Sequence, residues 1–250
     1  GTYGLGEEIA VKATFSEAVT LSGGDFVITM QMDGTDRDVT ISAIAGATEA
    51  TGTYTVQAGD ASGDLTAASV STTGQIKDAA LNVMNSFGIG TNLAASKALV
   101  IETTPPTVTN ITSTTNNGTY GVAANVNVTI TFSEAVTLSG AGAKLTVTLE
   151  TGATDASVEI TSVSNSTTAS GTYTVAVDHT TAGADLEAKA APTLAGTLKD
   201  QAGNEIVTLA IPNGQNLDDL KNIKIDATYP TITNVTSDVA DATYKIGDII

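Results

Sequence analysis

The feature that most constrains the fold of this chain is an internal repeat. Residues 14–23, Thr-Phe-Ser-Glu-Ala-Val-Thr-Leu-Ser-Gly, recur letter for letter as residues 131–140. Other phrases return in the same order: Gly-Thr-Tyr-Thr-Val at 52–56 and 171–175, Lys-Asp at 77–78 and 199–200, Pro-Thr-[Val/Ile]-Thr-Asn at 106–110 and 230–234, and Thr-Tyr at 2–3, 119–120 and 243–244. Because repeated phrases in a fixed order are typical of tandem arrays, we expect consecutive copies of one structural unit.

The positions of these phrases predict the domain boundaries. We expect a first repeat over 1–104, a complete second repeat over 105–228 and the start of a third over 229–250. The boundaries fall at prolines, which stiffen a short linker and cannot extend a strand ladder. If each repeat begins at the Pro-Thr phrase, the first repeat lacks its first strand. We then expect the first repeat to expose an unpaired sheet edge. We also expect the chain to be a segment of a longer polymer of repeats.

Alternating apolar residues predict the fold class. Residues 9–15 place Ile, Val, Ala and Phe on one face, and residues 126–132 repeat this pattern. Short strands separated by Gly, Asn, Asp and Ser indicate an antiparallel sandwich. We therefore expect an all-β fold of tandem Ig-like antiparallel β-sandwiches, joined end to end by short Pro-containing linkers. The broken alternation of 107–113 predicts a bulged edge strand, and Asn216 is expected to cap one helical turn.

Composition narrows the possible partners. The chain has no cysteine, so packing, with or without a metal, must stabilise the fold. Its formal net charge is -17. Such a surface repels nucleic acid and anionic lipid and attracts divalent cations, although solubility alone also explains the charge. No apolar run approaches the roughly 20 residues that span a bilayer. We expect no nucleic-acid partner and no membrane insertion in this segment.

The phrases Phe-Ser-Glu-Ala-Val (15–19 and 132–136), Lys-Asp-Gln-Ala-Gly-Asn (199–204) and Ile-Asp-Ala-Thr-Tyr-Pro-Thr-Ile-Thr-Asn (225–234) also resemble a known family. They are similar to the bacterial Ig-like tandem repeats of giant cell-surface proteins, such as the cyanobacterial swimming-motility surface protein and large adhesins. The resemblance covers nearly the whole chain. It implies an extracellular stalk, coat or filament at the cell surface, S-layer-like or adhesive. Two departures are Glu102, where the family usually has Asp, and Leu81, where the second repeat has Gly203.

Catalytic chemistry is not expected from these residues. His179 is the only histidine, and it stands at a position where the first repeat has Ala61. Carboxylates are so frequent that no pair indicates glycoside hydrolysis, and no Gly-rich phosphate loop joins a strand to a helix. We expect no enzyme. Two alternatives stay open: a non-catalytic module that binds polysaccharide, and an accessory module of an extracellular enzyme. Sugar binding usually relies on aromatic side chains, and the chain has only 4% aromatic residues and no Trp.

The strongest candidate site is a calcium site at the linker. Strands of an Ig-like sandwich alternate in direction, so the end of the second strand, the loop before the last strand and the incoming linker meet at one pole. In the second repeat these positions are Glu134, Asp200, Asn204 and Glu102, and in the first repeat Glu17, Asp78 and Asn82. Calcium takes roughly six to eight oxygen ligands in irregular geometry, whereas zinc and copper favour His or Cys.

Two other interpretations of these acidic residues remain. Asp and Asn also cap tight turns without any metal. Alternatively, Asp178 and Asp185 could bind an ion with Asp226 at the opposite pole of the second repeat.

The expected partners are neighbouring repeats of the same chain or other copies in a filament or coat. Glycan decoration is possible at the Asn-x-Ser/Thr sequences of Asn110, Asn117, Asn127, Asn165 and Asn234. The missing first strand allows two arrangements. Residues 230–250 begin the third repeat of a continuous chain, or they fill the first repeat of the next chain in a filament. Because 243–250 resemble 2–9 and would compete for one place, the overlap favours the continuous chain.

Overall fold

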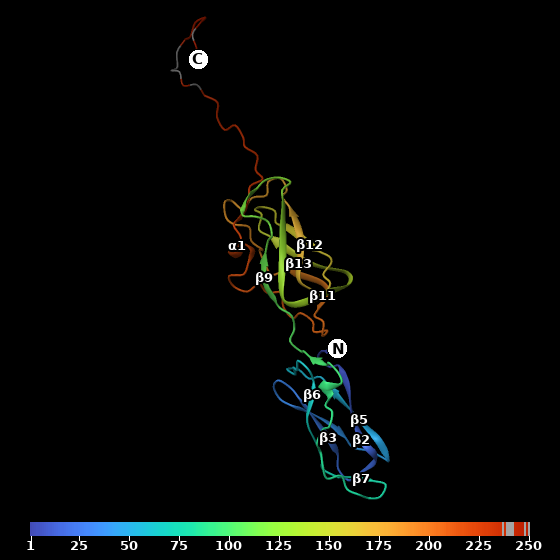
Figure 1. Ribbon diagram of the computed structural model, residues 1–250. Coiled ribbons are helices and arrows are strands. Elements are labelled where there is room, and N and C mark those ends of the chain that lie inside the picture. Colours follow the sequence, from blue (N-terminus) through green and yellow to red (C-terminus); the bar gives the residue numbers. More distant parts are fainter. Residues whose placement is uncertain (237, 239–242, 248, 250) are drawn as a thin grey trace.

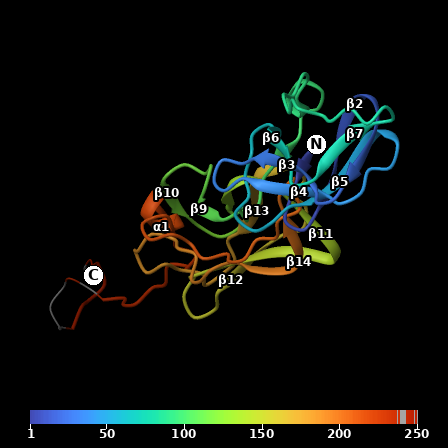
Figure 2. The ribbon, with the colours of Figure 1, turned by 90° about the horizontal axis from the view of Figure 1, so that it is seen from below.

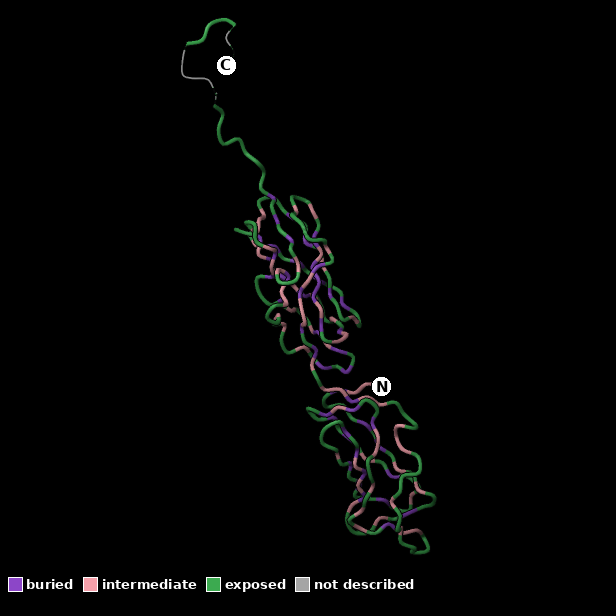
Figure 3. Tube along the Cα trace, turned by 60° about the vertical axis from the view of Figure 1, so that its left-hand side comes forward, coloured by how far each residue is buried: buried purple, intermediate pink, exposed green. Residues whose placement is uncertain are grey.

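The computed structural model describes residues 1–236, 238, 243–247 and 249. Two bodies lie end to end in an elongated molecule, and residues 229–236 lead away from the second body (Figure 1). One hydrophobic core runs from Ile9 to Ile101 and the other from Val108 to Ala227. Figure 3 shows the buried residues gathered inside each body and the described residues that follow Thr228 exposed. The domain boundaries at 104/105 and 228/229 stay a prediction. The two hydrophobic cores lie on either side of the boundary at 104/105.

The first body is a sandwich of two antiparallel three-stranded sheets, with the orders β5-β2-β7 and β4-β3-β6 (Figure 2). Its elements are β1 (Thr2–Tyr3), β2 (Glu8–Ser22), β3 (Phe26–Gln31), β4 (Arg37–Ile41), β5 (Ala47–Thr55), β6 (Thr66–Thr72), β7 (Gln75–Asp78), the 3₁₀ turn η1 (Leu93–Ala95) and β8 (Val100–Ile101).

The second body follows the same path with one long strand in place of two. Its elements are β9 (Val108–Thr112), β10 (Gly118–Tyr120), β11 (Asn125–Leu149), β12 (Ala156–Ile160), β13 (Ser166–Thr174), β14 (Thr193–Lys199), α1 (Leu217–Leu220) and β15 (Ile223–Ile225). The first half of β11 pairs with β9 and β13, and its second half pairs with β12 and β14. In the first body two strands, β2 and β3, take the place of β11, and the chain breaks between them at Gly23 and Gly24.

The all-β, antiparallel fold class is confirmed, together with two local predictions. β9 shows a register shift against β11 at Thr131/Phe132, which is the expected bulge. Asn216 caps α1 by accepting the N–H of Leu217, within a capping box with Asp219. No helix among the described residues is long and apolar enough to cross a bilayer.

Two short parallel pairs depart from the antiparallel prediction: β1 with β8, and β10 with β15. Thr2 lies opposite Val100, and Gly118 lies opposite Ile223. Each pair joins the start of a body to its last strand. Hairpin spacing in the sequence indicates only neighbouring partners, so these distant pairs were not predicted.

One sheet edge differs between the two bodies. In the second body β9 covers β11, and Phe132 is 3% exposed. In the first body, within the described residues, β5 is the only strand that pairs with β2 over residues 8–14. Phe15, the equivalent of Phe132, is only half-buried. Within the described residues, this part of β2 therefore has one partner strand where the equivalent part of β11 has two.

Candidate metal centre

The linker between the bodies is held at both of its ends. The N–H of Glu102 donates to the carbonyl oxygen of Tyr3 (3.1 Å), and Thr103 Oγ1 donates to the carbonyl oxygen of Asp60 (2.9 Å). At the other end Thr107 N–H donates to Ser133 Oγ (3.0 Å), while Ser133 N–H donates to the carbonyl oxygen of Thr107 (2.9 Å). Ser133 therefore fixes the position of its neighbour Glu134 beside the linker.

The phrase Phe-Ser-Glu-Ala forms an irregularity in β11. The pairing of β11 with β13 shifts register between Thr131 and Val136, so side chains here leave the strict alternation of a strand. Phe132 and Val136 remain in the core, with 3% and 0% of their surfaces exposed. Glu134 lies between them and is half-buried at the pole that faces the linker.

The turn after β14 supplies the third part of the site. Asp200 accepts two hydrogen bonds from Asn204, at Oδ1 from the backbone N–H (2.8 Å) and at Oδ2 from Nδ2 (2.9 Å). Gly203 adopts a φ of 86°, a left-handed conformation that glycine tolerates best. Asp200 and Asn204 are each 8% exposed. The phrase Lys-Asp-Gln-Ala-Gly-Asn thus folds as a tight turn that orients one carboxylate and one amide.

The structure brings together all four residues expected at the linker. Carboxylate oxygens of Glu102, Glu134 and Asp200 lie within 4.8 Å of one another. Asn204 Nδ2 donates to Glu102 Oε2 (2.6 Å) and to the carbonyl oxygen of Glu102 (3.2 Å), which connects the turn with the linker. Burial raises the pKa of Glu134, and the charges of Asp200 and Glu102 raise it further. The cluster therefore carries negative charge that its own groups do not neutralise.

This donor set suits a hard divalent cation. Three carboxylates and a main-chain carbonyl offer oxygen ligands, which calcium prefers. Rotation of the Asn204 amide about its last bond would present Oδ1 in place of Nδ2 and add another oxygen. The described residues of the cluster include neither His nor Cys, so zinc and copper would find none of their usual ligands here.

The equivalent residues of the first repeat form only part of such a site. Asn82 donates to Asp78 through its backbone N–H (2.8 Å) and Nδ2 (2.7 Å), and these bonds lower the pKa of Asp78. Leu81 takes a φ of 66° where the second repeat has glycine. Glu17 is exposed, and no group of three carboxylates forms around Glu17 or Asp78 among the described residues.

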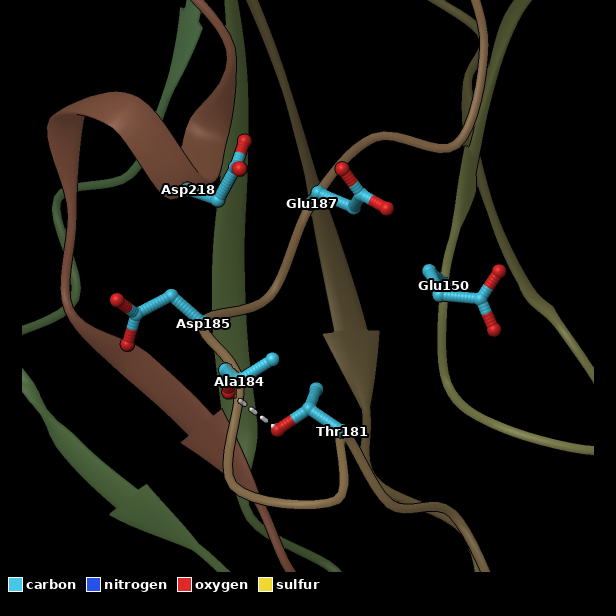
Figure 4. A pocket seen from close by; sticks show the side chains of 6 residues that line it. All are labelled: Glu150, Thr181, Ala184, Asp185, Glu187 and Asp218. Atoms are coloured by element: carbon cyan, nitrogen blue, oxygen red, sulfur yellow. Dashed lines mark hydrogen bonds between the residues drawn. The ribbon is translucent and has the colours of Figure 1, made fainter.

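The alternative site of Asp178, Asp185 and Asp226 is not assembled within the described residues. Asp226 Oδ1 accepts a hydrogen bond from Thr228 Oγ1 (2.7 Å), which lowers the pKa of Asp226. Asp185 instead lines a pocket of about 250 Å³ with Glu150, Glu187 and Asp218. Figure 4 shows these four carboxylates pointing in different directions rather than toward one point.

One buried charge was missed by the sequence reasoning. Asp60 is 2% exposed, accepts a hydrogen bond from the hydroxyl of Tyr54 (2.7 Å) and pairs with Arg37 (2.7 Å). Arg37 is the only arginine of the chain. Its rarity is the sequence signal that could have pointed to a buried ion pair at this position. In the second repeat the equivalent Tyr173 bonds His179 Nδ1 (2.7 Å), so His179 takes the place of Asp60 and not, as expected from the sequence, that of Ala61. Burial raises the pKa of Tyr173 to about 12.

The possible glycan acceptors differ in access. Asn117, Asn165 and Asn234 are exposed, whereas Asn110 and Asn127 are half-buried. Asn127 lies within β11, and its Oδ1 accepts hydrogen bonds from Thr114 N–H (3.0 Å) and Thr129 Oγ1 (2.8 Å). Decoration at any of the five stays a prediction.

No protein-family model and no curated protein matches the chain. Among solved structures it is similar to the crystal structure of chicken CNTN1 FN1-FN3 domains. The identity is 13%, the TM-score is 0.26, and the match covers 96% of this chain and 72% of that one. A TM-score this low does not support a conclusion about family or function. The resemblance of the repeated phrases to bacterial surface repeats therefore stays a prediction.

Proposed function

We propose that this chain is a mechanical segment of an extracellular surface protein, a stalk, coat or filament of tandem sandwiches, and that Ca²⁺ stiffens the joint between repeats. The observation that carries the proposal is the meeting of Glu102 with Glu134, Asp200 and Asn204. Glu102 follows the last strand of the first body, and the other three residues belong to the second. A cation held by all of them would bind one body to the other.

The metal-free joint combines attraction with repulsion. Asn204 bonds both Glu102 and Asp200, but Glu134 accepts no bond from Asn204 and raises the negative charge of the cluster. A cation would remove this repulsion and hold the linker against bending. A ligand that binds only the folded, assembled joint also stabilises it by mass action. Turn capping alone accounts for Asp200 and Asn204, but it gives no role to Glu134.

The test compares melting and shape of the 1–250 chain in calcium and in chelator. We expect calcium to raise the melting temperature of the second body and to narrow the distribution of interbody angles measured by small-angle X-ray scattering. Glu134→Gln should lose most of this response, while in chelator it should be at least as stable as the unaltered chain because one repelling charge is gone.

Glu17→Gln is the matched control, since it changes the same phrase in the first repeat at an exposed position. It should keep the full calcium response. Equal melting and scattering in calcium and chelator would contradict the proposal, and so would an equal loss of response in both variants.

A further inference from the structure

One side chain of the second body makes its shortest hydrogen bond with the first body. Asn204 Nδ2 donates to Glu102 Oε2 (2.6 Å), to the carbonyl oxygen of Glu102 (3.2 Å) and to Asp200 Oδ2 (2.9 Å). Glu102 is itself fixed to the first body, because its N–H donates to the carbonyl oxygen of Tyr3 (3.1 Å). The amide of Asn204 therefore links the two bodies directly, in a residue that is only 8% exposed.

The first repeat shows that this link is not needed to form the turn. Asn82 makes the same two bonds to Asp78, from its backbone N–H (2.8 Å) and from Nδ2 (2.7 Å), as Asn204 makes to Asp200. Asn82 is exposed, and within the described residues its side chain makes no other hydrogen bond. The two bonds from Asn204 to Glu102 thus go beyond what the turn requires.

The Asn204 amide uses the oxygen atoms that a cation at the joint would use. Its acceptors are the carboxylates of Glu102 and Asp200 and the main-chain carbonyl of Glu102. The N–H bonds direct positive hydrogens at the lone pairs that a hard cation needs as ligands. One lone pair cannot serve a hydrogen and a cation together, so a cation at these oxygens and this orientation of the amide exclude each other.

The amide has a second orientation that suits a cation. The last torsion of an Asn side chain is broad and roughly two-fold, so a half turn exchanges Nδ2 and Oδ1. Oδ1 now faces Gly4 of the first body, where an added Cβ would lie 3.2 Å from it, so glycine leaves space beside the amide. After the half turn Oδ1 would face the carboxylates, which is repulsive without a cation and favourable with one. The charge at the joint therefore decides which orientation is populated.

We propose that Asn204 is a two-position latch between the bodies. In the first position, which needs no metal, its amide closes the joint by donating to Glu102. In the second position, which rests on the calcium function proposed above, the amide is turned and Oδ1 is a ligand of the cation. Both positions connect the bodies, so calcium exchanges one closed joint for a stiffer one and does not assemble the joint. The latch also weakens calcium binding, because the first position has to be given up.

The first position is tested in chelator by small-angle X-ray scattering of the 1–250 chain. Asn204→Ala removes the amide without adding charge and keeps the backbone N–H that donates to Asp200. We expect a broader distribution of interbody angles, because the bonds to Glu102 are lost. Asn82→Ala is the matched control, since it removes the same bond inside the equivalent turn, and it should scatter as the unaltered chain does. Equal scattering of Asn204→Ala and the unaltered chain would overturn the latch.

Asn204→Asp separates the latch from a purely structural role. This change removes the donor of the first position and keeps an oxygen for the second. It should broaden the interbody angles in chelator and yet bind calcium about tenfold more tightly by isothermal titration, because no bond has to be given up and a charged ligand is added. A side chain that only maintained the turn would lose both properties together, and a weaker affinity than that of the unaltered chain would contradict the latch.

The half turn itself is read by NMR of the Asn204 side-chain amide, identified by its absence from the spectrum of Asn204→Asp. In chelator its N–H signals should exchange slowly with water, because both hydrogens are bonded, and at saturating calcium they should lose this protection. If calcium binds and the protection stays, the latch is overturned while the calcium proposal stands. If calcium does not bind, the calcium proposal and the second position both fail, and the scattering in chelator still decides the first.

Discussion

Two acidic residues with opposite pKa shifts should give the two bodies opposite responses to acid. Burial opposes ionisation of Asp60, but the hydrogen bonds from Arg37, Tyr54 and Gln57 outweigh it, and the pKa of Asp60 is lowered. Its stabilising contribution is therefore present above the pKa of an unfolded Asp and is lost as the pH falls through its folded pKa. The pKa of Glu134 is raised, so its contribution to the metal-free fold is complete below the pKa of an unfolded Glu and is lost as the pH rises through its folded pKa.

Urea unfolding of each body in chelator, from about pH 3 to 7, measures both effects. With Asp60→Asn, the first body should lose less stability as the pH falls. The same change should lower the free energy of unfolding of the first body at neutral pH. Its effect at neutral pH is expected to be about 1–3 kcal/mol, since the buried partners of Asp60 lose an acceptor. Glu134→Gln should instead remove the destabilisation that the second body suffers as the pH rises. In calcium, affinity should fall on acidification, because protons compete for Glu134. Parallel pH profiles in both bodies would contradict this account.

At the scale of strands, the repeated phrase Gly-Thr-Tyr-Thr-Val places a glycine where two strands come very close. A Cβ on Gly171 of β13 would lie 2.4 Å from Val158 Cγ1 of β12, and a Cβ on Gly52 of β5 would lie 2.4 Å from Val39 Cγ1 of β4. Gly171→Ala should therefore destabilise the second body by about 1–3 kcal/mol through overpacking. Val158→Ala in the same chain should relieve the clash, so the two changes together should cost less than the sum of each alone. Additive effects would show that the clash is not the cause.

The strands were predictable to a greater extent than their partners. Alternation in residues 9–15 and 126–132 identified two strands and their inward faces, because the period of a half-buried strand is visible locally. It did not indicate the parallel pairing of Thr2 with Val100, which depends on residues far apart in the chain. It also did not show that β11 continues through Gly140 and Gly142, where the first repeat breaks at Gly23 and Gly24.

The same limit explains what was found and missed at the sites. Glu102, Glu134 and Asp200 were predicted as neighbours because strand direction alone brings their loops to one pole. The pairing of Asp60 with Arg37 was not predicted, because it depends on the conformation of two loops and on the exclusion of water around Asp60. A repeat alignment shows where copies differ, but it does not show which difference is buried.

For the molecule as a whole, stiffness depends on how closely the two bodies meet at the joint. Gly4 of the first body is buried, and a Cβ there would lie 2.2 Å from the carbonyl oxygen of Ala202 in the metal-site turn. The equivalent residue of the second repeat, Gly121, has more room, since its Cβ would lie 3.5 Å from the nearest backbone oxygen, that of Asp226. A side chain at Gly4 would therefore collide with the turn of the second body at this joint.

Gly4→Ala should push the turn at 200–204 away from the linker and so separate Asn204 from Glu102, whose side chains are now 2.6 Å apart at Nδ2 and Oε2. We expect lower calcium affinity by isothermal titration, a broader distribution of interbody angles by small-angle X-ray scattering, and unchanged unfolding of each body alone. Gly121→Ala is the matched control and should leave all three unchanged. If both variants bind calcium and scatter as the unaltered chain does, the close contact at Gly4 does not set the geometry of the joint, and the flexibility of the array must be determined by the linker alone.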